Sequence, residues 1–355
     1  MNRIERLRAL FDDHGIDGML ITSPSNRRYV SQFTGSSGVA LISKDEAKFV
    51  TDFRYIDQAN EQAAGFEIVK HTGLITEEVA NQAKAMGIKK LGFEQDYLTY
   101  AVHQSYSKKV DGELVPVSGM IEKLRLIKDE DELKVLKEAA ELADKTFEHI
   151  LTFIKPGMRE IDVSNELEFF MRKNGATSSS FDIIVASGVR SSLPHGVASE
   201  KVIEKGDMVT LDFGALYKGY CSDITRTIAV GEPSEKMKEI HQIVLDAQLK
   251  GLEGLKPGMT GIEADALTRD YIKEKGYGEN FGHSTGHGIG LDVHEGPGLS
   301  FKVDTVLEPG MVVTVEPGIY VSGLGGVRIE DDVVITETGC EKLSTSSKEL
   351  FIIGE

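Results

Sequence analysis

Hydrophobic residues in the first third of the chain follow two different spacings. Four short runs are rich in apolar and β-branched residues, as expected for strands. These runs cover residues 17–22, 38–43, 47–52 and 66–70. The opening residues and residues 74–86 place apolar side chains at helical spacing instead. We therefore predict a small α/β domain over residues 1–122.

A long amphipathic helix is predicted to begin the second domain. The segment from residue 122 onward carries one apolar stripe at helical spacing, and Pro156 with Gly157 ends it. The stripe consists of Leu133, Leu136, Ala140, Ala143, Phe147 and Ile150. We place the domain boundary at the start of this segment and expect residues 123–355 to form the second domain.

Two segments of the second domain occur twice. The tetrapeptide KPGM stands at residues 155–158 and again at 256–259, which is 101 positions later. The segment EKGDMVTLDFG at 204–214 resembles EPGMVVTVEPG at 308–318, which is 104 positions later. Chance resemblance between two helix–turn–strand units is the alternative. We favour an internal duplication, in which two α+β halves face each other across a pseudo-twofold axis.

Composition and charge argue against several classes of partner. The 355 residues carry a formal net charge of −17, whereas phosphate binding needs clustered Lys and Arg. We therefore expect no nucleic acid and no anionic membrane surface as a partner. The N-terminal residues lack the apolar stretch of a signal peptide, and no apolar run is long enough to span a membrane. Because only Cys221 and Cys340 are present, we expect free thiols and a cytoplasmic location.

Each predicted half carries two acidic residues in β-type surroundings. Asp212 and Asp223 lie in the first half, Glu316 and Glu330 lie in the second, and the repeat aligns Asp212 with Glu316. Taken singly, each is compatible with a strand that has one face in water. Four in duplicated positions favour a shared site, because a buried carboxylate is costly unless it is paired or binds a metal.

A histidine-rich segment lies between these carboxylates. Residues 282–295 (GHSTGHGIGLDVHE) contain His283, His287 and His294. Carboxylates together with an imidazole favour manganese, cobalt or another hard-to-borderline divalent ion over a structural zinc site made of thiolates. Four negative charges exceed the charge of one divalent ion, so we expect two metal ions that share bridging carboxylates. Such a pair activates water and polarises a carbonyl, which predicts metal-assisted hydrolysis.

Three further residues are predicted to lie around this site. His195 stands in the turn SLPHG, where its imidazole could reach a cleft. Arg328 lies two residues before Glu330, so on one strand both would point to the same face and the arginine could orient a carboxylate. Tyr320 follows Glu316 by four residues, beyond a Pro-Gly turn.

Four motifs resemble the ordered signatures of the proline peptidase family. They are LDFGALYKGYCSDITRT, HSTGHGIGLDVHE, VEPGIY and GVRIEDD. The family includes aminopeptidase P (an Xaa-Pro aminopeptidase) and prolidase, and it is related to creatinase and methionine aminopeptidase. The resemblance is strong over residues 122–355 and weaker before them. It implies a creatinase/prolidase-like α/β N-terminal domain and an α+β catalytic domain with the pita-bread fold, whose pseudo-twofold symmetry agrees with the duplication.

The resemblance also implies a set of metal ligands. It implies two divalent ions, with manganese expected and cobalt or zinc as alternatives, held by Asp212, Asp223, His287, Glu316 and Glu330. Asp212 would bind one ion, and His287 with Glu316 would bind the other. Asp223 and Glu330 would bridge both ions, while Glu316 would also accept a proton from the bridging water.

The remaining site residues match family positions that do not bind metal. His195, His283 and His294 resemble the family histidines that contact substrate and stabilise charge on the tetrahedral intermediate. Tyr320 and Arg328 resemble its supporting residues.

The resemblance implies hydrolysis of peptides that have proline at the second position. Prolidases commonly carry an arginine shortly after the DVHE-like segment, where it holds the carboxylate of a dipeptide. Here Gly298 stands near that position, no arginine follows before residue 310, and Lys302 would be a poorer carboxylate fork. We therefore expect an Xaa-Pro aminopeptidase, with an Xaa-Pro dipeptidase (prolidase) as the alternative and a metal-free binding protein on the same scaffold as a remote one.

Family members are often dimers or tetramers in which the N-terminal domain closes a neighbour's site. The resemblance therefore implies a homodimer or a higher homo-oligomer.

Overall fold

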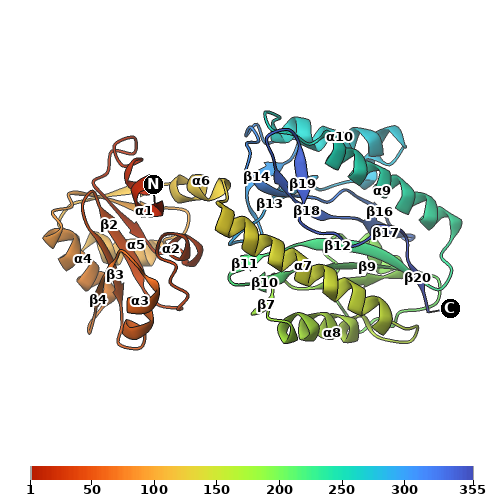
Figure 1. Cartoon of the computed structure of the whole chain (residues 1–355), viewed down its shortest axis with the longest axis horizontal. Coiled ribbons are helices and arrows are strands. Elements are labelled where there is room, and N and C mark those ends of the chain that lie inside the picture. Colours follow the sequence, from red (N-terminus) through yellow and green to blue (C-terminus); the bar gives the residue numbers. More distant parts are fainter. Residues whose placement is uncertain (1, 355) are drawn as a thin grey trace. The chain divides into compact units, whose positions relative to one another are not determined.

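The computed structural model describes residues 2–354, which form two compact units divided between Arg125 and Leu126 (Figure 1). The first unit contains a six-stranded sheet in the order β4-β3-β2-β1-β5-β6. Its strands are β1 (Gly18–Ile21), β2 (Val39–Ser43), β3 (Ala47–Thr51), β4 (Glu67–Lys70), β5 (Lys90–Glu94) and β6 (Glu113–Val117). The helices are α1 (Arg3–Arg8), α2 (Pro24–Ser31), α3 (Ile56–Gln62), α4 (Ile75–Ala85), α5 (Tyr100–Ser107) and α6 (Met120–Leu126).

The strands predicted from the apolar runs coincide with β1 to β4, and residues 74–86 contain α4. The three strands β1, β2 and β3 pair antiparallel, whereas β4, β5 and β6 join the sheet in parallel. Leu20, Leu41 and Val50 of the sheet are fully buried, together with Val79 and Ala83 of α4. The amphipathic face of that helix therefore closes the core of this unit.

The first long helix of the second unit is α7 (Glu130–Phe153). The helix α6 ends at Leu126 and α7 begins at Glu130, a break that the apolar stripe alone did not indicate. Asp129 is the N-cap: its side chain accepts the Glu132 N–H at 2.9 Å, and the Glu132 carboxylate accepts the Asp129 N–H at 2.9 Å. This reciprocal capping box satisfies two backbone donors that a helix end leaves free. The predicted stripe faces inward, and Leu136, Phe147 and Ile150 are almost fully buried.

Two halves follow one another in this unit. The first half continues with α8 (Glu160–Lys173), β7 (Ser178–Ser179), β8 (Ile184–Ser187), a 3-10 helix (Gly188–Ser192), β9 (Asp207–Phe213), β10 (Ala215–Tyr217), β11 (Tyr220–Cys221) and β12 (Ile224–Val230). The second half contains α9 (Glu235–Gly254), α10 (Gly261–Glu274), a 3-10 helix (Gly278–Asn280), β13 (Gly286–Gly288), β14 (Glu295–Leu299), β15 (Val312–Val315), β16 (Gly318–Val321), β17 (Gly325–Arg328), β18 (Asp331–Ile335), β19 (Cys340–Lys342) and β20 (Ile352–Ile353).

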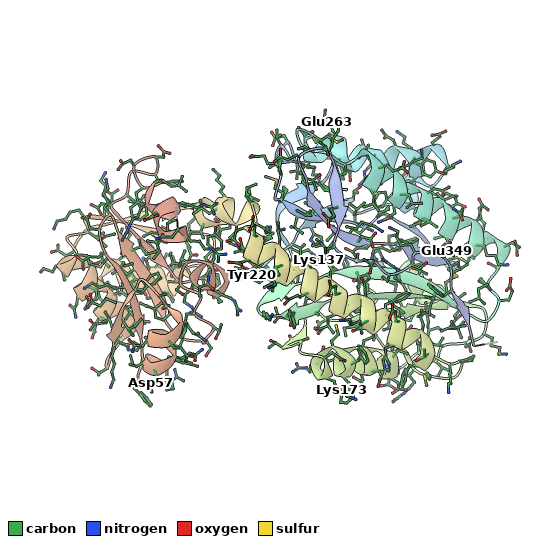
Figure 2. All side chains as sticks on the ribbon, viewed as in Figure 1. Asp57, Lys137, Lys173, Tyr220, Glu263 and Glu349 are labelled. Carbon is green, nitrogen blue, oxygen red and sulfur yellow. The ribbon has the colours of Figure 1, made fainter. Side chains whose placement is uncertain are left out.

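In Figure 1 the strands of this unit lie between the helices α7 and α8 and the helices α9 and α10. Figure 2 shows Lys173 at the end of α8 and Glu263 in the first turn of α10 on the outer surface. The helices therefore turn their polar faces outward and their apolar faces toward the strands.

The internal duplication predicted from the repeats is confirmed by equivalent backbone hydrogen bonds. The Gly157 N–H donates to the Ile203 carbonyl at 2.8 Å, and the Gly258 N–H donates to the Leu307 carbonyl at 2.8 Å. The two donors are 101 positions apart and the two acceptors are 104 positions apart, as in the sequence repeats. Both glycines have positive φ, 93° and 85°, a conformation that other residues adopt only with strain. The recurring KPGM segment is thus the same turn made twice.

The two halves are joined by a buried arginine on β12. Arg226 is 2% exposed and donates to the Asp331 carboxylate at 2.7 Å, to the Ser346 carbonyl at 3.0 Å and to the Ser347 carbonyl at 3.1 Å. Lys348 pairs with the other oxygen of Asp331 at 2.6 Å. A residue of the first half therefore holds the start of β18 and residues 346–347 of the second half.

Among residues 2–354, no helix combines the length and the apolar composition needed to cross a membrane.

We predict that Arg226→Met lowers the free energy of unfolding by about 3–5 kcal/mol, because it leaves Asp331 buried with one cation fewer. Urea denaturation followed by circular dichroism, in the presence of a chelator, measures this change. The control is Arg159→Met, since Arg159 pairs with Asp162 on the surface of the same unit, where solvent screens the interaction. Equal loss of stability in both variants would contradict the assigned role of Arg226.

Candidate metal centre

The four predicted carboxylates lie at equivalent strand ends of the two halves. Asp212 is on β9, opposite Thr225 of β12, and Asp223 lies immediately before β12. In the second half, Glu316 directly follows β15 and Glu330 directly precedes β18, which pairs antiparallel with β15. Each half therefore brings its two acidic residues together on neighbouring antiparallel strands.

Hydrogen bonds between the halves bring the two carboxylate pairs to one place. The Glu330 N–H donates to the Thr225 carbonyl at 3.1 Å, and the Thr225 hydroxyl donates to the Glu330 carboxylate at 2.6 Å. The Asp223 N–H donates to the carboxylate of Asp332 at 2.9 Å. These bonds connect β12 to the start of β18, so the acidic strand ends of both halves meet.

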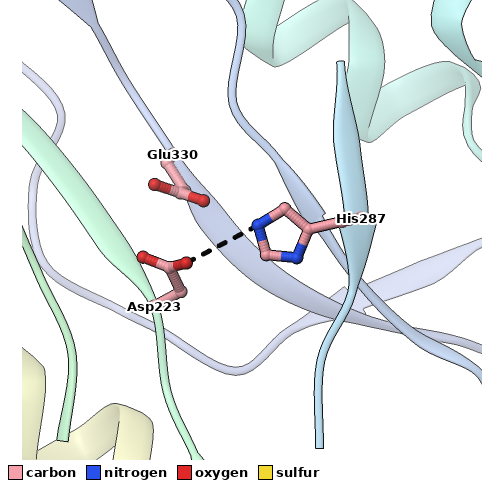
Figure 3. Close-up of side chains that lie close together, drawn as sticks. All are labelled: Asp223, His287 and Glu330. Carbon is pink, nitrogen blue, oxygen red and sulfur yellow. Dashed lines mark ion pairs between the residues drawn. The ribbon is translucent and has the colours of Figure 1, made fainter. Parts of the chain in front are cut away.

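Three of the predicted ligands converge tightly. Asp223, His287 and Glu330 each offer a ligand atom within 4.8 Å of the others, and Figure 3 shows the three side chains pointing toward one another. The His287 Nε2 atom lies 3.7 Å from Asp223 Oδ2 and 3.4 Å from Glu316 Oε1. The carboxylates of both halves and the imidazole thus share one centre.

The carboxylate oxygens of this centre fit metal ions. Asp212 Oδ1, Asp223 Oδ1 and Glu330 Oε1 are buried and have no hydrogen-bond donor among the described residues. Buried acceptors of this kind are rare unless an ion or another unseen donor satisfies them. Their oxygen-rich chemistry suits divalent ions that prefer hard ligands, such as Mn²⁺.

Burial and mutual repulsion oppose ionisation of three of these carboxyl groups. Burial, followed by the charges of Glu330 and Asp212, raises the pKa of Asp223 well above its usual range. Burial, followed by the charges of Glu316 and Asp212, does the same to the pKa of Glu330. The pKa of Glu316 is also raised, mainly by burial. The cluster therefore needs added positive charge to hold all its carboxylates ionised.

His287 presents one ring nitrogen to the carboxylates. Its Nδ1 atom lies 3.1 Å from the Gly288 carbonyl, which fixes the proton on Nδ1 and leaves the Nε2 lone pair facing the cluster. Burial lowers its pKa, which favours the neutral ring that a metal requires. On either side, a Cβ at Gly286 would lie 1.9 Å from the Thr314 carbonyl and one at Gly288 would lie 2.1 Å from the Gly296 carbonyl. The glycines are therefore needed for close strand packing around His287.

His283 has both ring nitrogens engaged elsewhere. Its Nδ1 lies 2.8 Å from the Ser284 carbonyl, and its Nε2 lies 2.8 Å from the Tyr320 hydroxyl. Arg328 donates to the same hydroxyl at 2.6 Å, so the tyrosine proton points to His283. Burial raises the pKa of Tyr320 to about 12, which keeps this proton in place near neutral pH.

Arg328 orients a different carboxylate from the one next to it in sequence. It donates to Asp212 Oδ2 at 2.5 Å and to the Pro194 carbonyl at 3.1 Å. Arg328 and Glu330 point to the same side, as expected, since both line the cavity and both contact the Thr225 hydroxyl. No single strand carries them, however, because β17 ends at Arg328 and β18 begins at Asp331. The guanidinium therefore links the second half to Asp212 of the first and holds the chain just before His195.

A cavity of about 510 Å³ opens beside this centre. All the predicted histidines and carboxylates line it, as does Arg328. Its apolar lining consists of Phe181, Ile184, Pro194, Val197 and Val293. Neither Gly298 nor Lys302 lines it, and Lys302 is an exposed residue. Lys302, which was considered from the sequence as a binder of the substrate carboxylate, is therefore not at the site.

The sequence analysis did not identify the cavity-lining residues near β8 or the role of Asp332 beside Asp223. Phe181 and Asp182 lie just before β8, and Ile184 at its start pairs with Asp212 of β9. The short apolar run at residues 183–186, before the SLPHG turn, was the available signal for a strand here. The carboxylate of Asp332, which accepts the Asp223 N–H, carried no signal of its own.

Known proteins resemble the chain over nearly its whole length. The family model described as "Metallopeptidase family M24" matches residues 134–337, and the one described as "Creatinase/Prolidase N-terminal domain" matches residues 3–127. A solved structure described as "Xaa-Pro dipeptidase from Bacillus anthracis" is 69% identical, with a TM-score of 0.98 and 99% of each chain covered.

Two further proteins are less similar. The Xaa-Pro dipeptidase of Pyrococcus furiosus is 43% identical over 98% of this chain and 99% of its own. The structure of an X-Pro aminopeptidase from Thermotoga maritima is 42% identical, with a TM-score of 0.93 over 98% of this chain and 100% of its own. The expected family and its pita-bread catalytic fold are thereby confirmed: the chain belongs to metallopeptidase family M24.

Proposed function

We propose that this metallopeptidase is an Xaa-Pro dipeptidase. The buried, donor-free carboxylates around His287 carry the proposal of metal-assisted hydrolysis. Two of the similar proteins, from Bacillus anthracis and Pyrococcus furiosus, are named Xaa-Pro dipeptidase. These names favour the dipeptidase alternative over the aminopeptidase that we expected from the missing arginine, although the Thermotoga maritima protein is named for the aminopeptidase.

We assign two divalent metal ions to the centre. The proposed ligands are Asp212, Asp223, His287, Glu316 and Glu330. The shared geometry of Asp223, His287 and Glu330 supports three of them, and the 3.4 Å approach of Glu316 to His287 supports the fourth. Asp212 keeps one oxygen free while Arg328 holds the other. We propose Mn²⁺ as the metal, with Co²⁺ or Zn²⁺ as alternatives.

When bound, the ions supply a hydroxide nucleophile near neutral pH and polarise the scissile carbonyl. Glu316 is the proposed proton acceptor, because its carboxylate lines the cavity and lies 3.4 Å from His287 within the proposed metal centre. His283 lines the cavity and is hydrogen-bonded to Tyr320, which is not among the lining residues, and this pair is proposed to stabilise charge on the substrate carbonyl oxygen. Arg328 holds Asp212 and the Pro194 carbonyl in position for this reaction.

His195 and His294 are proposed to hold the substrate carboxylate. Both line the cavity, and among residues 2–354 neither imidazole has a hydrogen-bond partner. A dipeptide ends in a carboxylate on its proline, and imidazole N–H groups can donate to it. The apolar wall, which includes Phe181 and Val293, suits the proline ring and the preceding side chain. These two histidines would serve in place of the missing arginine.

The peptide substrates with proline at the second position, the homodimer and the cytoplasmic location expected from the sequence remain predictions.

We predict opposite effects of Asp223→Asn on the metal-free and metal-loaded protein. Without metal, the variant should be more stable by on the order of 1 kcal/mol, because asparagine has no ionisable carboxyl group for burial and the neighbouring carboxylates to oppose. With Mn²⁺ at a hundred times its dissociation constant, the wild type should gain about 2.7 kcal/mol and the variant much less. Denaturation curves with and without Mn²⁺ measure both effects.

Asp182→Asn is the matched control for this test, since Asp182 lines the same cavity but lies outside the donor-free cluster. It should bind Mn²⁺ like the wild type. If both variants lose the stabilisation by Mn²⁺, the ligand assignment is wrong. If the wild type itself gains nothing from Mn²⁺, Co²⁺ or Zn²⁺, the metal-free binding protein becomes the better interpretation.

We predict that His287→Ala loses metal whereas His283→Ala retains it and loses much of its rate. Only His287 directs a free ring nitrogen at the carboxylates, while both nitrogens of His283 are engaged with Ser284 and Tyr320. Metal analysis after dialysis, combined with steady-state kinetics, separates the two effects. Equal metal loss in both variants would show that the ligand is wrongly assigned.

We predict that the enzyme prefers the dipeptide Ala-Pro over Ala-Pro-Ala by about tenfold or more in kcat/KM, which corresponds to ~1.4 kcal/mol. The free carboxylate of proline reaches His195 and His294 only in the dipeptide. The control substrate is Ala-Pro amide, which has the dipeptide's length without its charge and should be cleaved as poorly as the tripeptide. Equal or better cleavage of Ala-Pro-Ala would favour the aminopeptidase.

A further inference from the structure

An ion pair on α10 lies behind the histidine-rich segment. Asp265 and Arg269 are four residues apart, so they share one face of the helix. The guanidinium donates to both carboxylate oxygens, at 2.5 Å and 2.9 Å. Asp265 is 1% exposed, and the Arg269 side chain is 22% exposed. A bidentate pair of this kind is rigid, because both planar groups are fixed in one orientation.

The same pair binds the backbone of every second residue in the segment that carries His283. Arg269 donates to the Phe281 carbonyl at 3.0 Å and to the His283 carbonyl at 2.6 Å. Asp265 accepts the Thr285 N–H at 2.9 Å. The guanidinium also lies over the Phe281 ring, 4.4 Å from its centroid. Three successive anchor points therefore hold residues 281–285 against the helix.

The anchored segment continues to a carboxylate of the metal centre. The Thr285 carbonyl accepts the N–H of Glu316 at 2.8 Å. The Thr285 hydroxyl lies 2.6 Å from the hydroxyl of Thr268 on α10, which adds a second contact to the helix. Thr285 therefore connects the pair to the backbone of Glu316. His283, whose carbonyl Arg269 holds, connects the pair to the Tyr320 hydroxyl.

We propose that Asp265 and Arg269 are positioning residues, which set where His283 and Glu316 lie relative to each other. Neither touches the cavity, and neither offers an atom to the carboxylate cluster. Misplacing groups by about 1 Å can cost about 100-fold in rate, and outer partners of metal-site residues typically contribute about 10–100-fold. The pair therefore acts on the rate through two other residues. The kinetic part of this inference rests on the proposed dipeptidase activity.

The test compares Arg269→Met with Arg172→Met. Arg172 pairs with Glu168 at the same four-residue spacing on α8, the equivalent helix of the other half, and it makes no contact with the histidine segment. For Arg269→Met we expect bound Mn²⁺ to remain while kcat for Ala-Pro falls about 10–100-fold, with a smaller change in KM. Millimolar guanidinium should restore part of the lost rate, whereas Arg172→Met should behave like the wild type.

Hydrogen exchange provides a readout that does not depend on activity. Amides of residues 281–287 and of Glu316 should exchange faster in Arg269→Met than in the wild type. In Arg172→Met their exchange rates should equal those of the wild type. If the methionine variant fails to fold, Arg269→Lys serves in its place, since it keeps the charge but loses the fork, and it should show the same changes at smaller size.

Unchanged exchange in the segment overturns the proposal, as does loss of metal to the extent seen in His287→Ala. An unchanged kcat in a variant whose segment exchanges faster also overturns it. If the wild type cleaves no Xaa-Pro peptide, the proposed function fails, while the exchange experiment still decides whether the pair holds the segment.

Discussion

The burial of several carboxylates in one small volume is the constraint on which the rest of the site depends. Asp223, Glu316 and Glu330 resist ionisation because they are buried beside one another, and only Asp212 has an arginine as partner. Such a cluster is unfavourable in the free protein unless protons or cations neutralise it. The fold therefore holds an arrangement that metal ions would stabilise, at a cost to the stability of the metal-free chain.

The duplicated architecture makes this arrangement possible. One half alone supplies two carboxylates at the ends of antiparallel strands, and the second half supplies an equivalent pair. The bonds from Thr225 to Glu330 and from Arg226 to Asp331 hold these strand ends together. The same symmetry places α8 and α10 behind the segments that carry His195 and His283. On α8, Glu160 is fully buried and accepts hydrogen bonds from the backbone N–H groups and the hydroxyls of Ser187 and Ser199, which lie before and after His195.

The three histidines of GHSTGHGIGLDVHE have different surroundings although they are close in sequence. His287 turns a free nitrogen to the carboxylates, His283 is engaged by Tyr320, and His294 lines the cavity with its ring centre 4.3 Å from that of His287. The spacing of His283 and His287 is that of a zinc-binding helix, yet His287 lies on strand β13. Glycines on both sides allow this strand to pack closely against its neighbours.

The sequence by itself determined four of the six strands of the first unit, the apolar stripe of α7, the duplication, and the histidines and four of the acidic residues that line the cavity. These features follow from local spacing and from repetition, which need no knowledge of distant contacts. Only the tertiary structure decided that Arg328 pairs with Asp212 rather than Glu330, and that Asp265 with Arg269 anchors residues 281–285. These contacts depend on how a strand ends and on which helix face meets a distant segment, and hydrophobic periodicity specifies neither.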